Sequence, residues 1–419
     1  MMQLLTPCVV DTYAQERKLV KHTTYEYLVI GKGLLGAAAA RHLSAASHSV
    51  ALIGPDEPLD RASHQGIFGS HYDEGRITRI LDPHRIWALL AQRSIARYRE
   101  IEARSSVPFY HEVGHLTVGP EPAGPDDYVA RVQAVGTLLG VEYETYTDTA
   151  LAERFPYLAF EPGSLGLYQP QMAGHVSPRA QVRAQATIAQ QQGATLVPAT
   201  VDALHQSAGY VEVRTDAGQT YRADKVLLAT GGFSNAKHLL PRPLEITVHA
   251  RTIVLMELNA TEVARLHGMP SLIYKPRDAA GHCYILPPIR YPNGKYYLKI
   301  GGGDPDDPTL HSLVALQEWF RGTGSESAVH HLTAKLRAIV PDLCPVSLHT
   351  DSCVTTFTPT GQLYVDKLEG GRIGVVVGGN GSAAKSADEI GRLGALMLQH
   401  QEWVYDLEAT HFRARFMVS

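Results

Sequence analysis

A glycine-rich turn between two short strands constrains this chain more than any other feature. Residues 27–30 are apolar, residues 31–36 read GKGLLG (the G-x-G-x-x-G pattern), and the alanine-rich stretch that follows favours a helix. A second strand is expected over residues 48–53. In this β-loop-α-β order, glycines permit a tight turn and let a pyrophosphate approach the backbone at the N-terminus of the helix. The sequence therefore predicts a dinucleotide-binding fold.

The end of the second strand departs from the usual pattern. An acidic residue normally stands there and binds the ribose hydroxyls. This chain instead has Gly54, with Asp56 and Glu57 just beyond it. Either carboxylate could reach back to the ribose, or water could serve, so the departure does not decide which dinucleotide binds.

Length, charge and cysteine usage narrow the class of protein. The 419 residues, 44% of them hydrophobic, suit one large domain or two interleaved ones. A net charge of −4 offers no basic surface for nucleic acid, and no apolar run approaches the roughly 20 residues that span a bilayer. Cys8, Cys283, Cys344 and Cys353 form no metal-type pairs, which favours a reduced, cytoplasmic setting. Residues 1–24 lack the features of a secretory signal and are interpreted as an N-terminal extension.

Residues 109–119 contain His-Glu-x-x-His, a pattern that binds zinc when both histidines lie on one face of a helix. Gly114 lies inside the pattern, and apolar residues alternate on either side of it. A strand, a turn and a second strand are therefore expected, with His111 and His115 as sheet residues. No metal site is predicted.

Two further glycine-rich segments end apolar strands. Helical periodicity predicts two long helices, over residues 83–103 and 178–193. A strand over residues 195–204 and a hairpin turning at residues 216–218 lead to a buried strand that closes on Ala-Thr-Gly-Gly, residues 229–232. Residues 375–382 form the other segment, which leads into a helix.

Glycine-ended strands near the start, middle and end of the chain indicate one nucleotide-binding domain that is assembled from separated segments. We expect this domain to comprise residues 25–105, 171–240 and 346–419. The intervening segments, 106–170 and 241–345, are rich in predicted strands and turns and are expected to form a second domain that binds the substrate.

Four short motifs occur in the order found in one known family. They are SHYDEGRITR at residues 70–79, YILP at 284–287 with LKIG at 298–301, CVTTFTPTG at 353–361, and GGNGSAAK at 378–385. Together with the GKGLLG turn, they resemble the FAD-dependent amino-acid oxidase superfamily, and above all its monomeric sarcosine oxidase or N-methyl amino-acid oxidase branch. The resemblance covers nearly the whole chain from Tyr25. It implies an α/β (α+β) fold, in which a Rossmann-like FAD-binding domain of the glutathione-reductase type is interleaved with a mainly antiparallel β substrate domain.

By this resemblance, Arg79 and Lys385 bind a carboxylate of the substrate, and Tyr284 helps to close the pocket. A guanidinium group suits this task because its fork matches the two carboxylate oxygens. Arg76 and His71 are expected against the flavin ring, where cationic groups stabilise the negative charge of the reduced form.

A plainer interpretation of the two arginines is that they form surface salt bridges with Asp73 or Glu74. For Lys299, in the otherwise apolar stretch YYLKI, the resemblance implies a position near flavin N5 and a role in the reaction with O₂. Lysine is rarely buried without a reason. The alternative is a strand lysine that faces outward, as expected for Lys295.

The resemblance implies a thioether between Cys353 and the flavin 8-methyl group, whereas the alternative is a small buried apolar residue. The other residues expected to contact FAD are Gly31, Gly33, Leu34, Leu35, Gly36, Ser70, Val201, Thr230, Gly231, Gly378, Asn380 and Gly381, together with Arg76 and Lys385.

The chain also departs from the branch. Residues 301–303 are three glycines where the branch has an active-site histidine, so His282, Arg290 or Tyr274 could take up polar roles there. The substrate is therefore open among N-methyl amino acids, cyclic imino acids and larger amines.

The resulting functional prediction is an FAD-dependent oxidase that acts on the CH–NH bond of a secondary amine, N-alkyl or cyclic, that bears a carboxylate. By resemblance, hydride passes to flavin N5, the imine is hydrolysed, and O₂ becomes H₂O₂. The expected partners are the small substrate and O₂, with no nucleic acid and no membrane, and the protein is expected to be a monomer or a small homo-oligomer. The alternatives are a flavin-dependent dehydrogenase with another electron acceptor and a flavin-binding protein without turnover; an NAD-dependent dehydrogenase gives no role to Cys353, Lys299 or Lys385.

Overall fold

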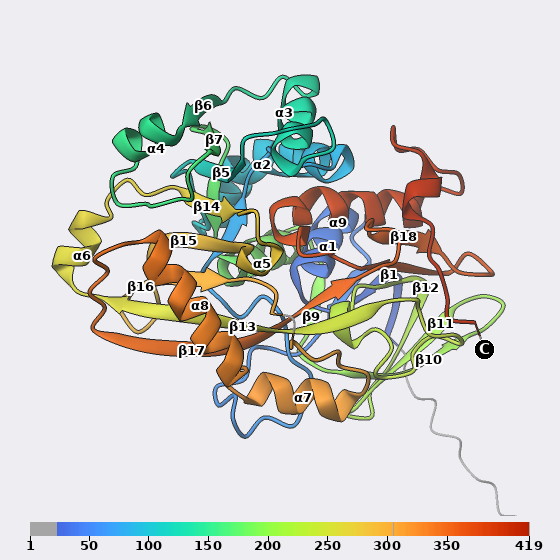
Figure 1. Cartoon of the computed structure of the whole chain (residues 1–419). Coiled ribbons are helices and arrows are strands. Elements are labelled where there is room, and N and C mark those ends of the chain that lie inside the picture. Colours follow the sequence, from blue (N-terminus) through green and yellow to red (C-terminus); the bar gives the residue numbers. More distant parts are fainter. Residues whose placement is uncertain (1–22, 305, 419) are drawn as a thin grey trace, which may run out of the picture.

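The computed structural model describes residues 23–304 and 306–418 (Figure 1). Residues 1–22 of the predicted extension lie outside the described residues. Thr23 and Thr24, expected in that extension, instead begin strand β1 (Thr23–Ile30), where they pair with Tyr221 and Arg222 of the neighbouring strand. β-Branched threonine favours the extended backbone. The strand therefore begins earlier than the apolar residues 27–30 from which it was predicted.

The first sheet has eight strands, and its centre is parallel. Its strands are β1, β2 (Val50–Ile53), β9 (Thr195–Val197), β10 (Val201–Gln206), β11 (Val211–Thr215), β12 (Thr220–Leu228), β18 (Tyr364–Lys367) and β19 (Ile373–Val377). Side chains of successive residues in a strand point to opposite faces. In β1, Tyr27 and Val29 therefore pack among the helices, while Leu28 and Ile30 join the core on the other face. The parallel centre confirms the predicted Rossmann-like architecture.

Four helices pack around this sheet and one another. They are α1 (Leu34–Ser44), α2 (Arg85–Ser105), α5 (Pro178–Gln191) and α9 (Ala383–Gln399). Gly391 lets α9 approach α1 closely, because a Cβ at this position would lie 2.4 Å from the Cβ of Ala38. The buried carboxylate of Asp388 on α9 also accepts hydrogen bonds from Arg41 of α1 and Arg97 of α2, each at 2.5 Å. These contacts fix the orientation of α1, whose first turn lines the cavity described below.

The single strand predicted over residues 195–204 is wrong. The chain forms β9, which pairs with β2, and then β10, which pairs with β11. Pro198 lies between them and cannot donate a ladder hydrogen bond, so the strand ends there. The hairpin predicted at residues 216–218 does join β11 and β12.

The second sheet also has eight strands and occupies the left half of Figure 1. Its strands are β5 (His115–Pro120), β6 (Glu144–Thr147), β7 (Ser164–Gln169), β13 (Thr247–Leu258), β14 (Ser271–Tyr274), β15 (Cys283–Arg290), β16 (Tyr296–Gly301) and β17 (Ser347–Phe357). Every pairing is antiparallel except that of β14 with β5. β17 falls in the segment 346–419, which was expected wholly in the nucleotide-binding domain, yet it pairs with β13 along eleven residues.

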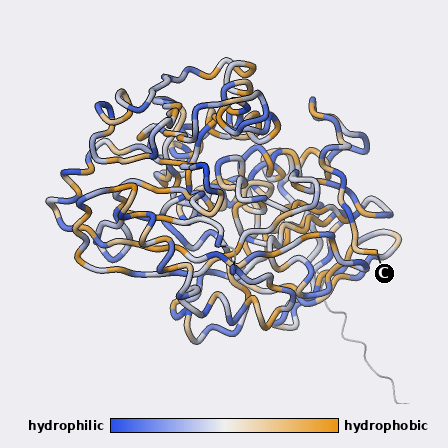
Figure 2. The backbone as a smooth tube through the Cα atoms, viewed as in Figure 1, coloured by the Kyte–Doolittle hydropathy of each residue, from blue (hydrophilic) through white to orange (hydrophobic). Residues whose placement is uncertain are grey.

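A third sheet has three strands, β3 (Arg76–Thr78), β4 (Tyr110–His111) and β8 (Gly174–Val176), and β8 is the central one. The other α-helices are α3 (Tyr128–Leu138), α4 (Asp148–Arg154), α6 (Ala260–Arg265), α7 (Leu313–Arg321) and α8 (Glu326–Ile339). Hydrophobic stretches occur in both halves of the molecule (Figure 2), consistent with separate core clusters for the two large sheets. Among the described residues, no helix is long and apolar enough to cross a membrane.

Candidate active site

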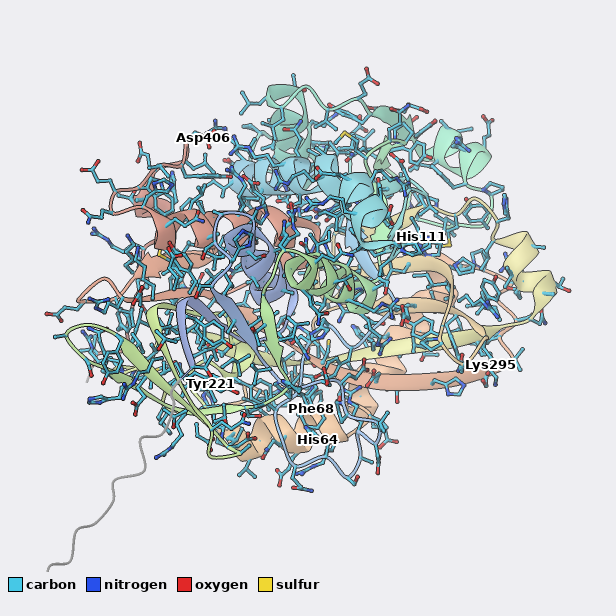
Figure 3. All side chains as sticks on the ribbon, turned by 180° about the vertical axis from the view of Figure 1, so that it is seen from behind. His64, Phe68, His111, Tyr221, Lys295 and Asp406 are labelled. Atoms are coloured by element: carbon cyan, nitrogen blue, oxygen red, sulfur yellow. The ribbon has the colours of Figure 1, made fainter. Side chains whose placement is uncertain are left out.

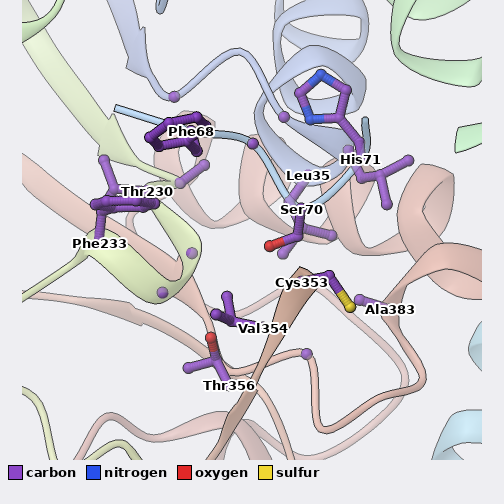
Figure 4. A pocket seen from close by; sticks show the side chains of 18 of the residues that line it. Leu35, Phe68, Ser70, His71, Thr230, Phe233, Cys353, Val354, Thr356 and Ala383 are labelled. Carbon is purple, nitrogen blue, oxygen red and sulfur yellow. The ribbon is translucent and has the colours of Figure 1, made fainter. Parts of the chain in front are cut away.

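A cavity of about 470 Å³ lies where turns of the first sheet meet strands of the second. Figure 4 shows Ser70, Cys353 and Ala383, from three distant segments, gathered at one part of it. The predicted site residues that line it are Gly31, Gly33, Leu34, Leu35, Ser70, His71, Arg76, Val201, Thr230, Gly231, Tyr284, Cys353, Gly378 and Gly381. Those that do not line it are Gly36, Arg79, Lys299, Asn380 and Lys385.

The turn from β1 to α1 forms a backbone cradle. Gly31 has a φ of 108°, and a Cβ there would lie 2.3 Å from the carbonyl oxygen of Ala229. A Cβ on Gly36 would lie 1.8 Å from the carbonyl oxygen of Gly31. Gly33 begins α1 without a side-chain cap, so the first-turn N–H groups are open to a ligand. Because free N–H groups and the positive end of the helix dipole attract phosphate, this cradle fits the pyrophosphate of FAD.

Steric crowding explains why a glycine, Gly54, follows β2 where an acidic residue was expected. A Cβ on Gly54 would lie 2.4 Å from the backbone nitrogen of Lys32 and 2.6 Å from its Cβ. Asp56 forms an ion pair with the Lys32 ammonium, and Glu57 binds Arg179 at 2.6 and 2.7 Å. The two acids considered for the ribose are thus engaged by cations, one of them from the cradle itself.

The loop between β2 and β3 is held over the cavity by aromatic packing that the sequence did not reveal. Phe68 stacks on Phe320 of α7 with ring centroids 5.1 Å apart, and Phe320 in turn stacks on Phe233 at 5.9 Å. Phe68 and Phe233 both line the cavity (Figure 4). Offset aromatic stacking at these distances stabilises the loop beyond simple burial.

His71 is a neutral imidazole in this environment. Burial, and then the positive charges of Arg179, Lys32 and Arg76, lower the pKa of His71 to about 3. It therefore contributes no charge at neutral pH, and the positive charge of this wall of the cavity comes from arginine and lysine.

Arg76 and Tyr284 face the cavity from β3 and β15. Arg76 donates hydrogen bonds to the carbonyl oxygens of Gly75 at 3.0 Å and Ser70 at 3.1 Å. A Cβ on Gly301 would lie 2.4 Å from the Tyr284 hydroxyl, so the first glycine of the run 301–303 makes room for this ring. Burial raises the pKa of Tyr284 to about 12, which keeps the phenol protonated and able to donate.

Lys299 lies directly behind these groups. It is fully buried, forms an ion pair with Asp73 and donates to the Gly75 carbonyl at 2.8 Å. Its ammonium group is 5.6 Å from the centroid of the Tyr284 ring. Burial, followed by the charge of Arg76, lowers the pKa of Lys299, whereas the ion pair with Asp73 opposes this and favours the protonated ammonium.

Asp73 connects the two cations. It pairs with both Lys299 and Arg76, and its other oxygen accepts a hydrogen bond from the Tyr291 hydroxyl at 2.9 Å. The salt bridge between Arg76 and Asp73 was considered from the sequence as a surface feature, but only 5% of Asp73 is exposed. Its buried position makes it part of the site, because it holds Lys299 and Arg76 on one carboxylate.

Arg79 and Lys385, which the resemblance assigns to a carboxylate of the substrate, both bind a carboxylate of the protein. Asp82 Oδ2 lies 3.0 Å from Arg79 Nη1 and 2.6 Å from Lys385 Nζ. Although burial alone would raise it, the charges of Lys385 and Arg79 lower the pKa of Asp82 to about 2. Burial, reinforced by Arg79, lowers the pKa of Lys385 to about 8. Asp82 was not among the residues predicted from the sequence, where its only signal is its spacing of three residues from Arg79.

Cys353 lies on β17 and lines the cavity with a free thiol. Its backbone pairs with Arg251 of β13, and its carbonyl oxygen accepts a hydrogen bond from Trp319 at 2.8 Å. Asn380 takes part in the turn after β19 instead of lining the cavity, because its side chain bonds Gly378 O at 2.7 Å and the Thr358 N–H at 3.0 Å.

The remaining candidates from the sequence lie elsewhere. His282, Arg290 and Tyr274 do not line the cavity, whereas Gly302 and Gly303 do. His115 on β5 bonds Ser271 at 2.9 Å and Thr117 at 3.0 Å. In residues 23–304 and 306–418, no cluster of three or more metal-ligating side chains occurs.

The sequence and the fold of this chain resemble those of known flavoproteins. A family model described as "FAD dependent oxidoreductase" matches residues 26–397. N-methyl-L-tryptophan oxidase of Yersinia pestis is 24% identical over 390 residues, which covers 92% of this chain and 98% of that protein. The crystal structure of NikD, an amino acid oxidase of nikkomycin biosynthesis, matches with a TM-score of 0.75 at 22% identity and covers 95% of this chain and 99% of its own. Glycine oxidase from Geobacillus kaustophilus matches with a TM-score of 0.70 at 19% identity, over 93% and 98% of the two chains.

Proposed function

The chain belongs to the family of FAD-dependent oxidoreductases, and from that premise we propose that it oxidises the C–N bond of a secondary amine that bears a carboxylate, with O₂ as the electron acceptor. The observation that carries the proposal is one cavity that joins the glycine cradle at Gly31 to Arg76 and Tyr284, with the buried ammonium of Lys299 behind them. The names of the relatives, oxidases of N-methyl-L-tryptophan and of amino acids, support the same chemistry.

When bound, FAD would supply the redox chemistry, namely hydride acceptance from the carbon beside the amine nitrogen and transfer of two electrons to O₂, which with two protons gives H₂O₂. The protein supplies position and charge. The N–H groups at the start of α1 bind the pyrophosphate, and Arg76 places a fixed positive charge where negative charge develops during reduction. Tyr284 donates from its neutral hydroxyl and limits the space beside the reacting carbon.

Lys299 is proposed to assist the oxygen step. A positive charge near the reacting atoms stabilises developing superoxide, and burial strengthens this effect because the local dielectric is low. Asp73 and the Gly75 carbonyl fix the ammonium group, so it needs little reorganisation during the reaction. The burial of Lys299 favours the oxidase over a dehydrogenase of the same fold.

Arg79 and Lys385 are proposed to bind the substrate's carboxylate, and Tyr284 to close over the amine. The two cations lie together although they are far apart in sequence, and together with Asp82 they carry a net positive charge. Water then hydrolyses the imine product. Cys353 is proposed as the covalent anchor of the flavin because its thiol lines the cavity on a rigid strand. We also propose that the protein is cytoplasmic and is a monomer or a small homo-oligomer.

The proposal is tested by anaerobic mixing of the FAD-loaded protein with a panel of N-methyl and cyclic amino acids. We expect at least one to bleach the visible flavin band, and admission of air to restore it with formation of H₂O₂. Recovery that is slow in air but fast with an added dye would identify a dehydrogenase, and a band that no amine bleaches would identify a binding protein without turnover.

A matched pair of variants tests the oxygen step. Lys299→Met should slow recovery in air by roughly 100-fold, the usual scale for loss of one fixed charge at a transition state. Lys295→Met changes an exposed lysine just before the same strand and should leave recovery unchanged (Figure 3). Equal rates in the two variants would remove the role proposed for Lys299.

A further inference from the structure

The carboxylate of Asp82 stands where the proposed function places a carboxylate of the substrate. A single oxygen, Oδ2, is shared by Arg79 at 3.0 Å and Lys385 at 2.6 Å, and Oδ1 accepts the His84 N–H at 3.0 Å. All three charged side chains are nearly enclosed, with 7% of Arg79, 3% of Lys385 and 3% of Asp82 exposed. Neither cation lines the cavity, and both are bonded to Asp82.

The charges around this triad do not cancel. Across the described part of the chain, Asp82 is the one acid that pairs with Arg79 or Lys385, so two cations share one anion. The groups facing the triad from other elements are His115 on β5, Tyr128 on α3 and Lys275 after β14, and none of them is a carboxylate.

Burial and the nearby cations hold the pKa of His115 well below its ordinary value, and burial raises the pKa of Tyr128, so these two groups are neutral. In the same described residues, the Nε of Arg79 is a buried donor without a hydrogen-bond partner. A positive cluster with an unused buried donor can accept one more anion, but only against the repulsion of the carboxylate already in place.

We propose that Asp82 is a specificity-determining residue that competes with the substrate's carboxylate for Arg79 and Lys385. This inference rests on the proposed function and deepens it. A ligand whose affinity comes from its carboxylate alone must displace or share Asp82 and therefore binds weakly. A carboxylated amine with a larger remainder gains further contacts along the cavity, whose lining includes Gly302 and Gly303. The site thus favours larger carboxylated amines over the smallest amino acids.

The test measures the dissociation constant of acetate, a bare carboxylate, for the FAD-loaded protein by calorimetry and by the change in the visible flavin spectrum. We expect Asp82→Asn, which removes the competing charge but keeps a side chain of the same shape, to bind acetate at least about tenfold more tightly than the unmodified protein. Asp82→Ser, which keeps an acceptor for the His84 N–H, is measured beside it, and Asp82→Glu should retain weak binding because it keeps the charge. Adding Arg79→Met to Asp82→Asn should abolish the gain.

Asp406→Asn is the control for a change of one charge, because Asp406 lies on the surface and pairs with Arg93 (Figure 3). It should leave acetate binding unchanged. An acetate affinity that is equal or weaker in both Asp82→Asn and Asp82→Ser would overturn the competition. If carboxylated amines still bleach the flavin in that case, the proposed function stands without it. If acetate binds more tightly in the variants but no amine bleaches the flavin, the competition stands and the proposed function falls.

Discussion

Replacing Lys299 with methionine isolates one buried charge of the site. Methionine preserves much of the volume of lysine, so packing changes little. The substitution removes the ammonium group that pairs with Asp73 and donates to the Gly75 carbonyl at 2.8 Å, in a place with no exposed surface. In the variant, the buried carboxylate of Asp73 is paired with Arg76 alone.

The magnitude follows from the partners that remain. Removing one member of a buried ion pair costs about 3–5 kcal/mol because it leaves an uncompensated charge. Asp73 retains Arg76 and the Tyr291 hydroxyl, and the desolvation of Lys299 is recovered, so the lower end applies. We expect Lys299→Met to lower the free energy of unfolding by about 3 kcal/mol. Asp73→Asn in the same background should then cost less than it does alone, with a coupling energy of about 1–3 kcal/mol.

Urea unfolding of the FAD-loaded protein, followed by circular dichroism, measures these differences. Lys295→Met is the matched control, since this side chain is 52% exposed and solvent screens its ion pair with Glu257, so this substitution should change the free energy of unfolding little. A loss below about 1 kcal/mol in Lys299→Met, or additive effects in the double variant, would refute the view that one carboxylate binds both cations of the site.

Three further predictions concern other parts of the cavity. Because the folded-state pKa of Asp82 is about 2 against an ordinary 3.8, its stabilising contribution is complete above about pH 4 and is lost as the pH falls toward 2; the unfolding free energy of Asp82→Asn, measured between about pH 6 and 2, should fall less steeply, and an identical slope would contradict this. Acid precipitation should leave a yellow pellet for the unmodified protein and a yellow supernatant for Cys353→Ser, whereas a yellow supernatant from both would exclude the thioether. Gly54→Ala would place a Cβ 2.4 Å from the backbone nitrogen of Lys32, so the ratio of FAD to protein after gel filtration should drop, and a full complement would show that the turn can move.

The sequence predicted those parts of the fold that have a local cause. The glycines of residues 31–36 require tight backbone approach, and the structure places Ala229 O and Gly31 O at those points. The single strand predicted over residues 195–204 is instead two strands, β9 and β10, because Pro198 interrupts the ladder between them.

Long-range partners could not be predicted in this way. Lys385 and Asp82 are 303 positions apart, and Lys299 and Asp73 are 226 apart. Their meeting depends on how the segment around β3 packs against distant parts of the chain, which no local pattern of residues specifies. The resemblance named Arg79 and Lys385, but the motif that carries Arg79 spans residues 70–79 and does not include Asp82, the acid between them.

The position of β19 has a consequence for how the protein is made. The end of β12, Val226 to Leu228, pairs with β1 on one side but receives its second parallel partner, β19, only when residues 373–377 have left the ribosome, and α9, which packs on α1, follows still later. During synthesis the edge of β12 is therefore unpaired for the time needed to add about 145 residues, long enough to associate with other chains. Gly378, Gly381, Ala383 and Ala384 also line the cavity and are made after residue 377, so the cavity wall is incomplete until this segment has been added.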